Sequence, residues 1–163
     1  MKLLLDQTLV LHPDDNKTNI DLSFMLVRSY HALFIHTAYE PKIVQDEVFS
    51  RQLIEAGIER YIPDNAKERW GNWRDYLPVM NFITLSLDYE EEYIGCAHRH
   101  SPVQDHIISA SYSSPGFLRH DAAPGRWNCV LNCHAVVDKN VTYTLQVYGA
   151  EESEVLHDHI QAF

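Results

Sequence analysis

Apolar and polar residues alternate with a period of two over most of the chain. In the two clearest runs, 127–135 and 141–147, apolar side chains occupy every second position. Successive side chains of a β-strand point to opposite faces, so this pattern is typical of strands with one buried face. The short segment 138–140 between the runs predicts that they pair as a hairpin. The same alternation occurs in five further segments: 5–12, 20–26, 31–39, 81–89 and 107–112.

Segment 46–70 departs from this alternation. Its apolar residues between Val48 and Ala56 fall near helical spacing, and Pro63 ends the pattern, which predicts one short helical insertion around residues 46–70. At least seven strands with polar outer faces then remain. We expect an all-β fold, an antiparallel β-sandwich of the jelly-roll or immunoglobulin-like kind, with a closed barrel as the alternative.

Length and charge narrow the class of protein. The chain has 163 residues, which predicts a single β-sandwich domain over 1–163 with about the last ten residues as a tail. It carries 13 Lys and Arg against 23 Asp and Glu, a formal net charge of −10. Nucleic acids and anionic membranes attract clustered basic residues, so we expect neither as a partner.

The N-terminus and the cysteines indicate the cellular compartment to expect for the protein. The apolar run over residues 1–5 is shorter than a secretory signal needs, and no run reaches the length of a membrane span. The three cysteines, Cys96, Cys129 and Cys133, are odd in number and lack the spacing of a disulfide framework. We therefore expect a cytoplasmic protein with free thiols.

Ten histidines raise the question of a metal site. Two residues that are two apart on a strand lie about 6.6 Å from each other on one face, so His98 and His100 could share one divalent ion, zinc or manganese. His106 is the first candidate for a third ligand, and Asp105 is the second. The alternative is a solvated polar loop in a protein without a cofactor.

A second candidate site is aromatic. Trp70, Trp73 and Tyr76 cluster in an expected loop, where exposed rings could stack on a sugar or a planar ligand. Alternatively, these rings cover one end of the sandwich core. His120 and Asp121 lie in a short excursion between two Pro-Gly turns, and we add them to the predicted ligand-binding residues.

Short motifs follow one another in a specific order between residues 76 and 149. They are Leu77-Pro78, the strand at 81–87, Ala97-His98-Arg99, Ser114-Pro115-Gly116-Phe117, Ala123-Pro124-Gly125-Arg126-Trp127 and His134-Ala135-Val136. This order resembles the N-terminal β-sandwich of CehA/McbA-type metallohydrolases, which precedes a catalytic PHP (polymerase and histidinol phosphatase) domain. The resemblance covers the C-terminal half of the chain well and the first half loosely.

The resemblance implies an accessory module, because the family's metal ligands and hydrolytic activity belong to the PHP domain. The pair His157 and His159 resembles the beginning of that domain, and a charged tail is the alternative. Our first hypothesis is a non-catalytic accessory β-sandwich that binds a small or carbohydrate-like ligand or docks to a PHP-type metallohydrolase. The alternatives are a metal-dependent hydrolase that uses His98 and His100, and a structural domain that forms a homo-oligomer.

Overall fold

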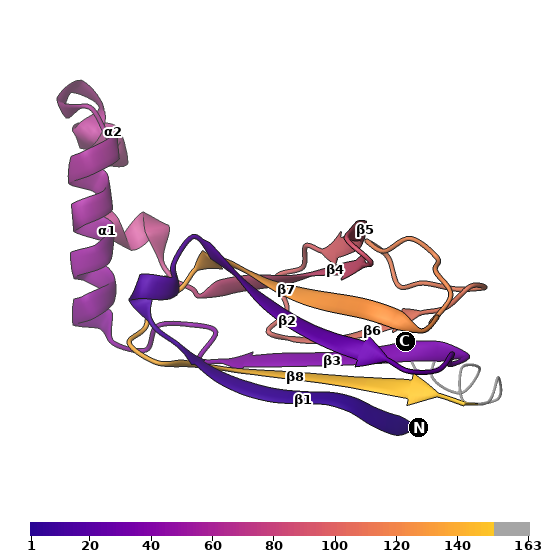
Figure 1. Cartoon of the computed structure of the whole chain (residues 1–163). Helices are drawn as coiled ribbons and strands as arrows, with labels where there is room; N and C mark the ends of the chain where they lie inside the picture. Colours follow the sequence, from indigo (N-terminus) through magenta and orange to yellow (C-terminus); the bar gives the residue numbers. More distant parts are fainter. Residues whose placement is uncertain (152–163) are drawn as a thin grey trace.

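The structure, a computed structural model, describes residues 1–151, so the expected tail with His157 and His159 lies outside it. Eight strands form two four-stranded antiparallel sheets packed face to face (Figure 1). This arrangement confirms the all-β antiparallel sandwich. The strands are β1 (Lys2–Leu11), β2 (Thr18–Leu26), β3 (Ala32–Glu40), β4 (Phe82–Tyr89), β5 (Glu92–Ala97), β6 (Val103–Ile108), β7 (Gly125–Ala135) and β8 (Val141–Ala150).

The strand order selects the jelly roll from the expected alternatives. One sheet has the order β1-β8-β3-β6 and the other has the order β2-β7-β4-β5. Consecutive strands mostly alternate between the two sheets, as in the eight-stranded double Greek key. The four edges β1, β6, β2 and β5 stay open, so the sheets do not close into a barrel.

The core lies between the inner faces of the two sheets and follows the alternation in the sequence. Trp127, Cys129 and Leu131 of β7 are fully buried, as are Leu145 and Val147 of β8. Burial raises the pKa of the Cys129 thiol to about 12, so this cysteine acts as a small apolar residue. All three cysteines are free.

The helical insertion is confirmed at the expected place. It comprises α1 (Glu47–Tyr61), the 3₁₀ turn η2 (Asp64–Ala66), α2 (Lys67–Trp70) and the 3₁₀ turn η3 (Trp73–Tyr76). The insertion projects from one end of the sandwich (Figure 1). None of the helices within residues 1–151 is long and apolar enough to cross a membrane.

The predicted hairpin at 138–140 is wrong, because β7 and β8 belong to different sheets. Their apolar faces meet across the core instead of lying side by side. The fully buried side chain of Asn81 holds the connection: its amide oxygen accepts from the Val137 backbone N–H at 2.8 Å, and its amide nitrogen donates to an Asp138 carboxylate oxygen at 2.8 Å. These bonds stabilise a crossover between the sheets.

The strand predicted at 107–112 ends earlier than expected, at Ile108. Ser109 begins a turn, in which its hydroxyl donates to the Tyr112 backbone carbonyl at 2.8 Å and accepts from the Tyr112 backbone N–H at 2.9 Å. A serine side chain thereby replaces the ladder partners that a longer strand would need.

We predict that Trp127→Ala lowers the free energy of unfolding by roughly 3 to 5 kcal/mol, because Trp127 is fully buried and the substitution leaves a large cavity. Denaturant titration measures this change. Trp70→Ala is the matched control, since Trp70 is 52% exposed, and should change stability by less than about 1 kcal/mol. Equal losses in both variants would contradict this description of the core.

Candidate ligand-binding site

The structure brings His98 and His100 together, but around an aromatic ring. Both residues follow β5 and are exposed. The His100 ring stacks on Phe82 with centroids 4.6 Å apart, and the His98 ring contacts Phe82 edge-on at 5.2 Å. His134 stacks on the same ring at 4.9 Å. The three imidazoles therefore pack against Phe82.

His106 lies away from this group. It sits on β6 in the other sheet with 1% of its surface exposed, and its ring contacts Phe117 at 5.1 Å. Within residues 1–151, no group of three or more His, Cys, Asp or Glu side chains could hold a metal ion. The structure thus does not assemble the predicted ligand set of His98, His100 and His106.

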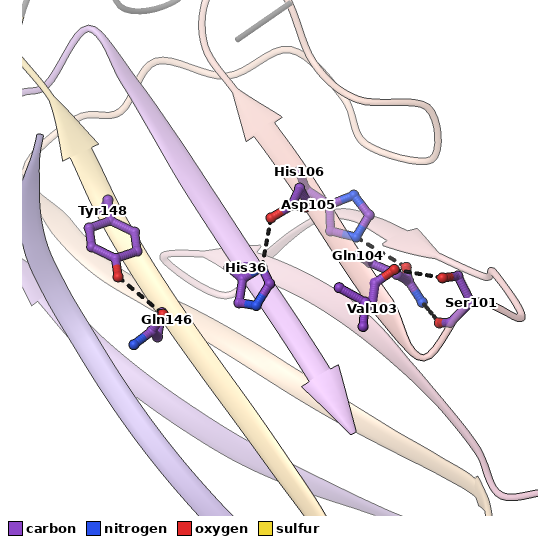
Figure 2. Close-up of polar contacts among 8 residues, drawn as sticks. All are labelled: His36, Ser101, Val103, Gln104, Asp105, His106, Gln146 and Tyr148. Carbon is purple, nitrogen blue, oxygen red and sulfur yellow. Dashed lines mark hydrogen bonds and ion pairs between the residues drawn. The ribbon is translucent and has the colours of Figure 1, made fainter. Parts of the chain in front are cut away.

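The hydrogen bonds of Gln104 decide the protonation of His106 (Figure 2). The Gln104 amide nitrogen donates to the Ser101 carbonyl at 2.8 Å. It also donates to the Arg99 carbonyl at 3.3 Å. Its amide oxygen is left to accept from Nε2 of His106, 3.2 Å away. The His106 Nδ1 atom then carries a lone pair, and it is buried without a hydrogen-bond partner.

The predicted aromatic cluster is only partly open to a ligand. Trp73 is buried, and the guanidinium groups of Arg74 and Arg51 lie 4.6 Å and 5.6 Å from the centre of its ring. Trp70 and Tyr76 are exposed, and the Tyr76 hydroxyl donates to the Trp70 carbonyl at 2.8 Å. Trp73 therefore anchors the insertion, while Trp70 and Tyr76 remain predicted contact residues.

His120 covers one end of the core. Its ring lies 4.6 Å from Tyr89 and 5.3 Å from the buried Trp127, and its Nδ1 donates to the Asp121 backbone carbonyl at 2.7 Å. The neighbouring Asp121 is exposed. The His120 ring therefore packs against Tyr89 and Trp127, while Asp121 lies beside it at the surface.

A site that the sequence analysis missed lies on the outer face of the sheet β1-β8-β3-β6. There a cavity of about 250 Å³ opens beside a second, smaller apolar cluster, which contains Phe34 and Ile107 with Tyr148 packed against it. An outer sheet face is usually polar, so buried apolar residues on it mark an exception. The cavity is lined by Met1, Phe34, Ile35, His36, Asp105, His106, Ile107 and Tyr148.

The strand register builds this cavity from two neighbouring cross-strand rows. The apolar row places Tyr148 opposite Phe34 and Phe34 opposite Ile107. The polar row, two residues along each strand, runs from Asp6 through Gln146 and His36 to Asp105. Side chains that are opposite each other on one face of a sheet come into contact, so the cavity has an apolar side and a polar side.

Hydrogen bonds hold two pairs of side chains on this face, His36 with Asp105 and Tyr148 with Gln146 (Figure 2). His36 Nδ1 lies 2.7 Å from Asp105 Oδ1, and because a carboxylate only accepts, the imidazole carries its proton on Nδ1. The Tyr148 hydroxyl donates to the Gln146 amide oxygen at 3.1 Å. These bonds fix the rings at the edge of the cavity.

Sequence reasoning missed this site because its parts are far apart in the chain. His36 and Asp105 are 69 residues apart, and only the pairing of β3 with β6 brings them together. One signal was present: Phe34 and Tyr148 are aromatic at outward positions of strands whose outward positions should be polar.

We predict that the purified protein holds no stoichiometric zinc or manganese, because His98, His100 and His134 pack on Phe82 and His106 is buried in the other sheet. Elemental analysis measures the content. The double variant His98→Ala with His100→Ala should then match the parent in metal content and fold. Stoichiometric metal that this variant loses would instead support the metal-dependent hydrolase.

We predict that stability falls as the pH is lowered from 6.5 towards 4. Burial, with a smaller effect of Arg99, lowers the pKa of His106 from 6.5 to about 4. The unfolded chain therefore binds a proton in this window that the folded chain excludes. The loss from this residue is on the order of 3 kcal/mol.

His106→Leu should remove this part of the pH dependence, and denaturant titrations at several pH values measure it. The matched control is His31→Leu, since His31 is exposed, and it should keep the parent's pH profile. An unchanged slope in His106→Leu would show that other groups cause the acid sensitivity.

Comparison with known proteins does not assign the chain to a family. No protein-family model matches the sequence, and none of the curated proteins compared with it is a significant match. The resemblance to the sandwich of CehA/McbA-type metallohydrolases therefore remains an expectation from the motifs.

Proposed function

We propose that the protein is a non-catalytic accessory β-sandwich that binds a small, largely apolar molecule in the cavity on the sheet β1-β8-β3-β6. The observation that carries this proposal is the pairing of an apolar row with a hydrogen-bonded polar row around one cavity. Ligand sites are typically concave and apolar, with a few fixed polar groups that orient the ligand.

The size and lining of the cavity narrow the range of possible ligands. Its volume of about 250 Å³ is just below the ~300–1,000 Å³ typical of sites for drug-sized molecules, which favours a ligand with a single ring. The aromatic side chains Phe34 and Tyr148 offer ring contacts. The apolar lining favours such a ring over a polyhydroxylated sugar, so the carbohydrate-like ligand is the weaker form of the proposal.

Binding is favoured over nucleophilic catalysis by the composition of the site. The pair His36 and Asp105 resembles the base and the orienting acid of a catalytic triad. However, none of the residues that line the cavity is a serine, a threonine or a cysteine. The Tyr148 hydroxyl donates a hydrogen bond to Gln146, so it is positioned to contact a ligand and not to attack it.

The accessory part of the proposal comes from the resemblance to sandwiches that precede a PHP domain. The partner would be a PHP-type metallohydrolase or a second copy of this chain. Co-purification with such a hydrolase, and the mass of the protein in solution, test these two partners separately from the ligand.

We predict that single-ring compounds at millimolar concentration shift the backbone NMR signals of His36, Ile107 and Tyr148. Tyr148→Ala should weaken binding by about tenfold, because it removes one aromatic contact from the cavity. Tyr61→Ala is the matched control, since Tyr61 is 67% exposed on the helical insertion, and it should leave the affinity unchanged. Shifts confined to Trp70 and Tyr76 would instead place the ligand at the predicted aromatic cluster.

A further inference from the structure

The side chains of the polar row carry several hydrogen-bond acceptors. Asp6 and Asp105 stand at the two ends of the polar row, and a carboxylate only accepts. Each carboxylate therefore requires its neighbour in the row to turn a donor towards it. One Gln146 amide N–H and the His36 Nδ1–H are used within the row, and carboxylate acceptors remain for a ligand.

At one end, Asp6 orients Gln146 and, through it, Tyr148. The Gln146 amide nitrogen donates to Asp6 Oδ1 at 3.2 Å. Its amide oxygen therefore faces Tyr148 and accepts the hydroxyl proton at 3.1 Å. The Tyr148 oxygen keeps a lone pair that can accept a further hydrogen bond.

At the other end, Asp105 binds the imidazole of His36 through one oxygen. His36 Nδ1 donates to Asp105 Oδ1 at 2.7 Å. An ionised carboxylate has about four lone-pair sites, so the other sites of Asp105 are available to a donor in the cavity. Its side chain is 45% exposed, which leaves it accessible to a ligand from solvent.

We infer that the ligand is a cationic amine whose ammonium group binds Asp105 and whose ring lies on the apolar row. This inference rests on the proposed binding function and names the ligand class. An ammonium group has three donors and no acceptor, which complements a site that offers acceptors. The aromatic ring of Tyr148 attracts a cation in addition.

The charge of the whole protein favours the same class. The formal net charge is −10, so the surrounding potential concentrates cations and repels carboxylates and phosphates. A neutral ring compound of the same shape would gain the apolar contacts but not the charge-assisted hydrogen bond to Asp105. The amine should therefore bind more tightly than its neutral analogue.

The test compares benzylamine with benzyl alcohol, which has nearly the same shape and is neutral. Titration calorimetry or NMR titration at pH 7.5 should show that benzylamine binds at least tenfold more tightly. Asp105→Asn should remove this preference and retain the binding of benzyl alcohol, because the asparagine oxygen can still accept from His36. Asp14→Asn, which removes the same charge at an exposed position on the β1–β2 connection, should keep the preference.

The outcomes separate the two proposals. Equal affinity for the two compounds in the parent protein would overturn the amine and leave the proposed binding function intact. A preference that persists in Asp105→Asn would also overturn the amine inference, because another group would then bind the ammonium. If neither compound bound the parent protein at millimolar concentration, the proposed binding function would fail and the inference with it.

Discussion

The strict alternation of side chains along each strand is the constraint on which the rest of the structure depends. Once β3 buries Leu33 and Ile35 between the sheets, Phe34 and His36 must point to the outer face. On β6, Ile108 is buried between the sheets, and its neighbour Ile107 therefore points to the outer face. The core therefore decides which residues border the outer cavity.

The register of strand pairing brings the outward side chains together in one site. The pairing of β3 with both β6 and β8 places aromatic residues opposite one another in one row and polar residues opposite one another in the next. A shift of one residue would exchange the inner and outer faces of a strand and would bury His36 while exposing Ile35. The burial of the core thus holds the distance between His36 and Asp105.

The sequence predicts elements well and their partners poorly. The period-two runs identify strands because one face of each is buried, and the helical insertion stands out by its different spacing. The connection at 138–140 has a length that suits a hairpin or a crossover equally. The crossover is selected by Asn81, which bonds to Val137 and Asp138 from another part of the chain.

The candidate site illustrates the same limit. His98 and His100 are close in sequence and in space, yet their rings meet on Phe82, whose position no local pattern reveals. His36 and Asp105 form a hydrogen bond of 2.7 Å beside the cavity, but their contact depends on how two distant strands pair. Both contacts depend on the pairing of strands, and the local spacing of residues predicts neither.

The two outer faces differ in what lies beside their polar groups. On the sheet β2-β7-β4-β5, Asn128 donates to Asp21 and accepts from Ser23, and Thr84 is bonded to His134. Carboxylates border a pocket there as well, but the lining of that pocket, Asp21, Asp88, Glu91, Arg126 and Asn128, contains no apolar residue. On the other sheet, the acceptors of Asp105 lie beside an apolar row. This combination, more than the presence of histidine, distinguishes the cavity as the place where a ligand would gain both apolar contacts and a hydrogen bond.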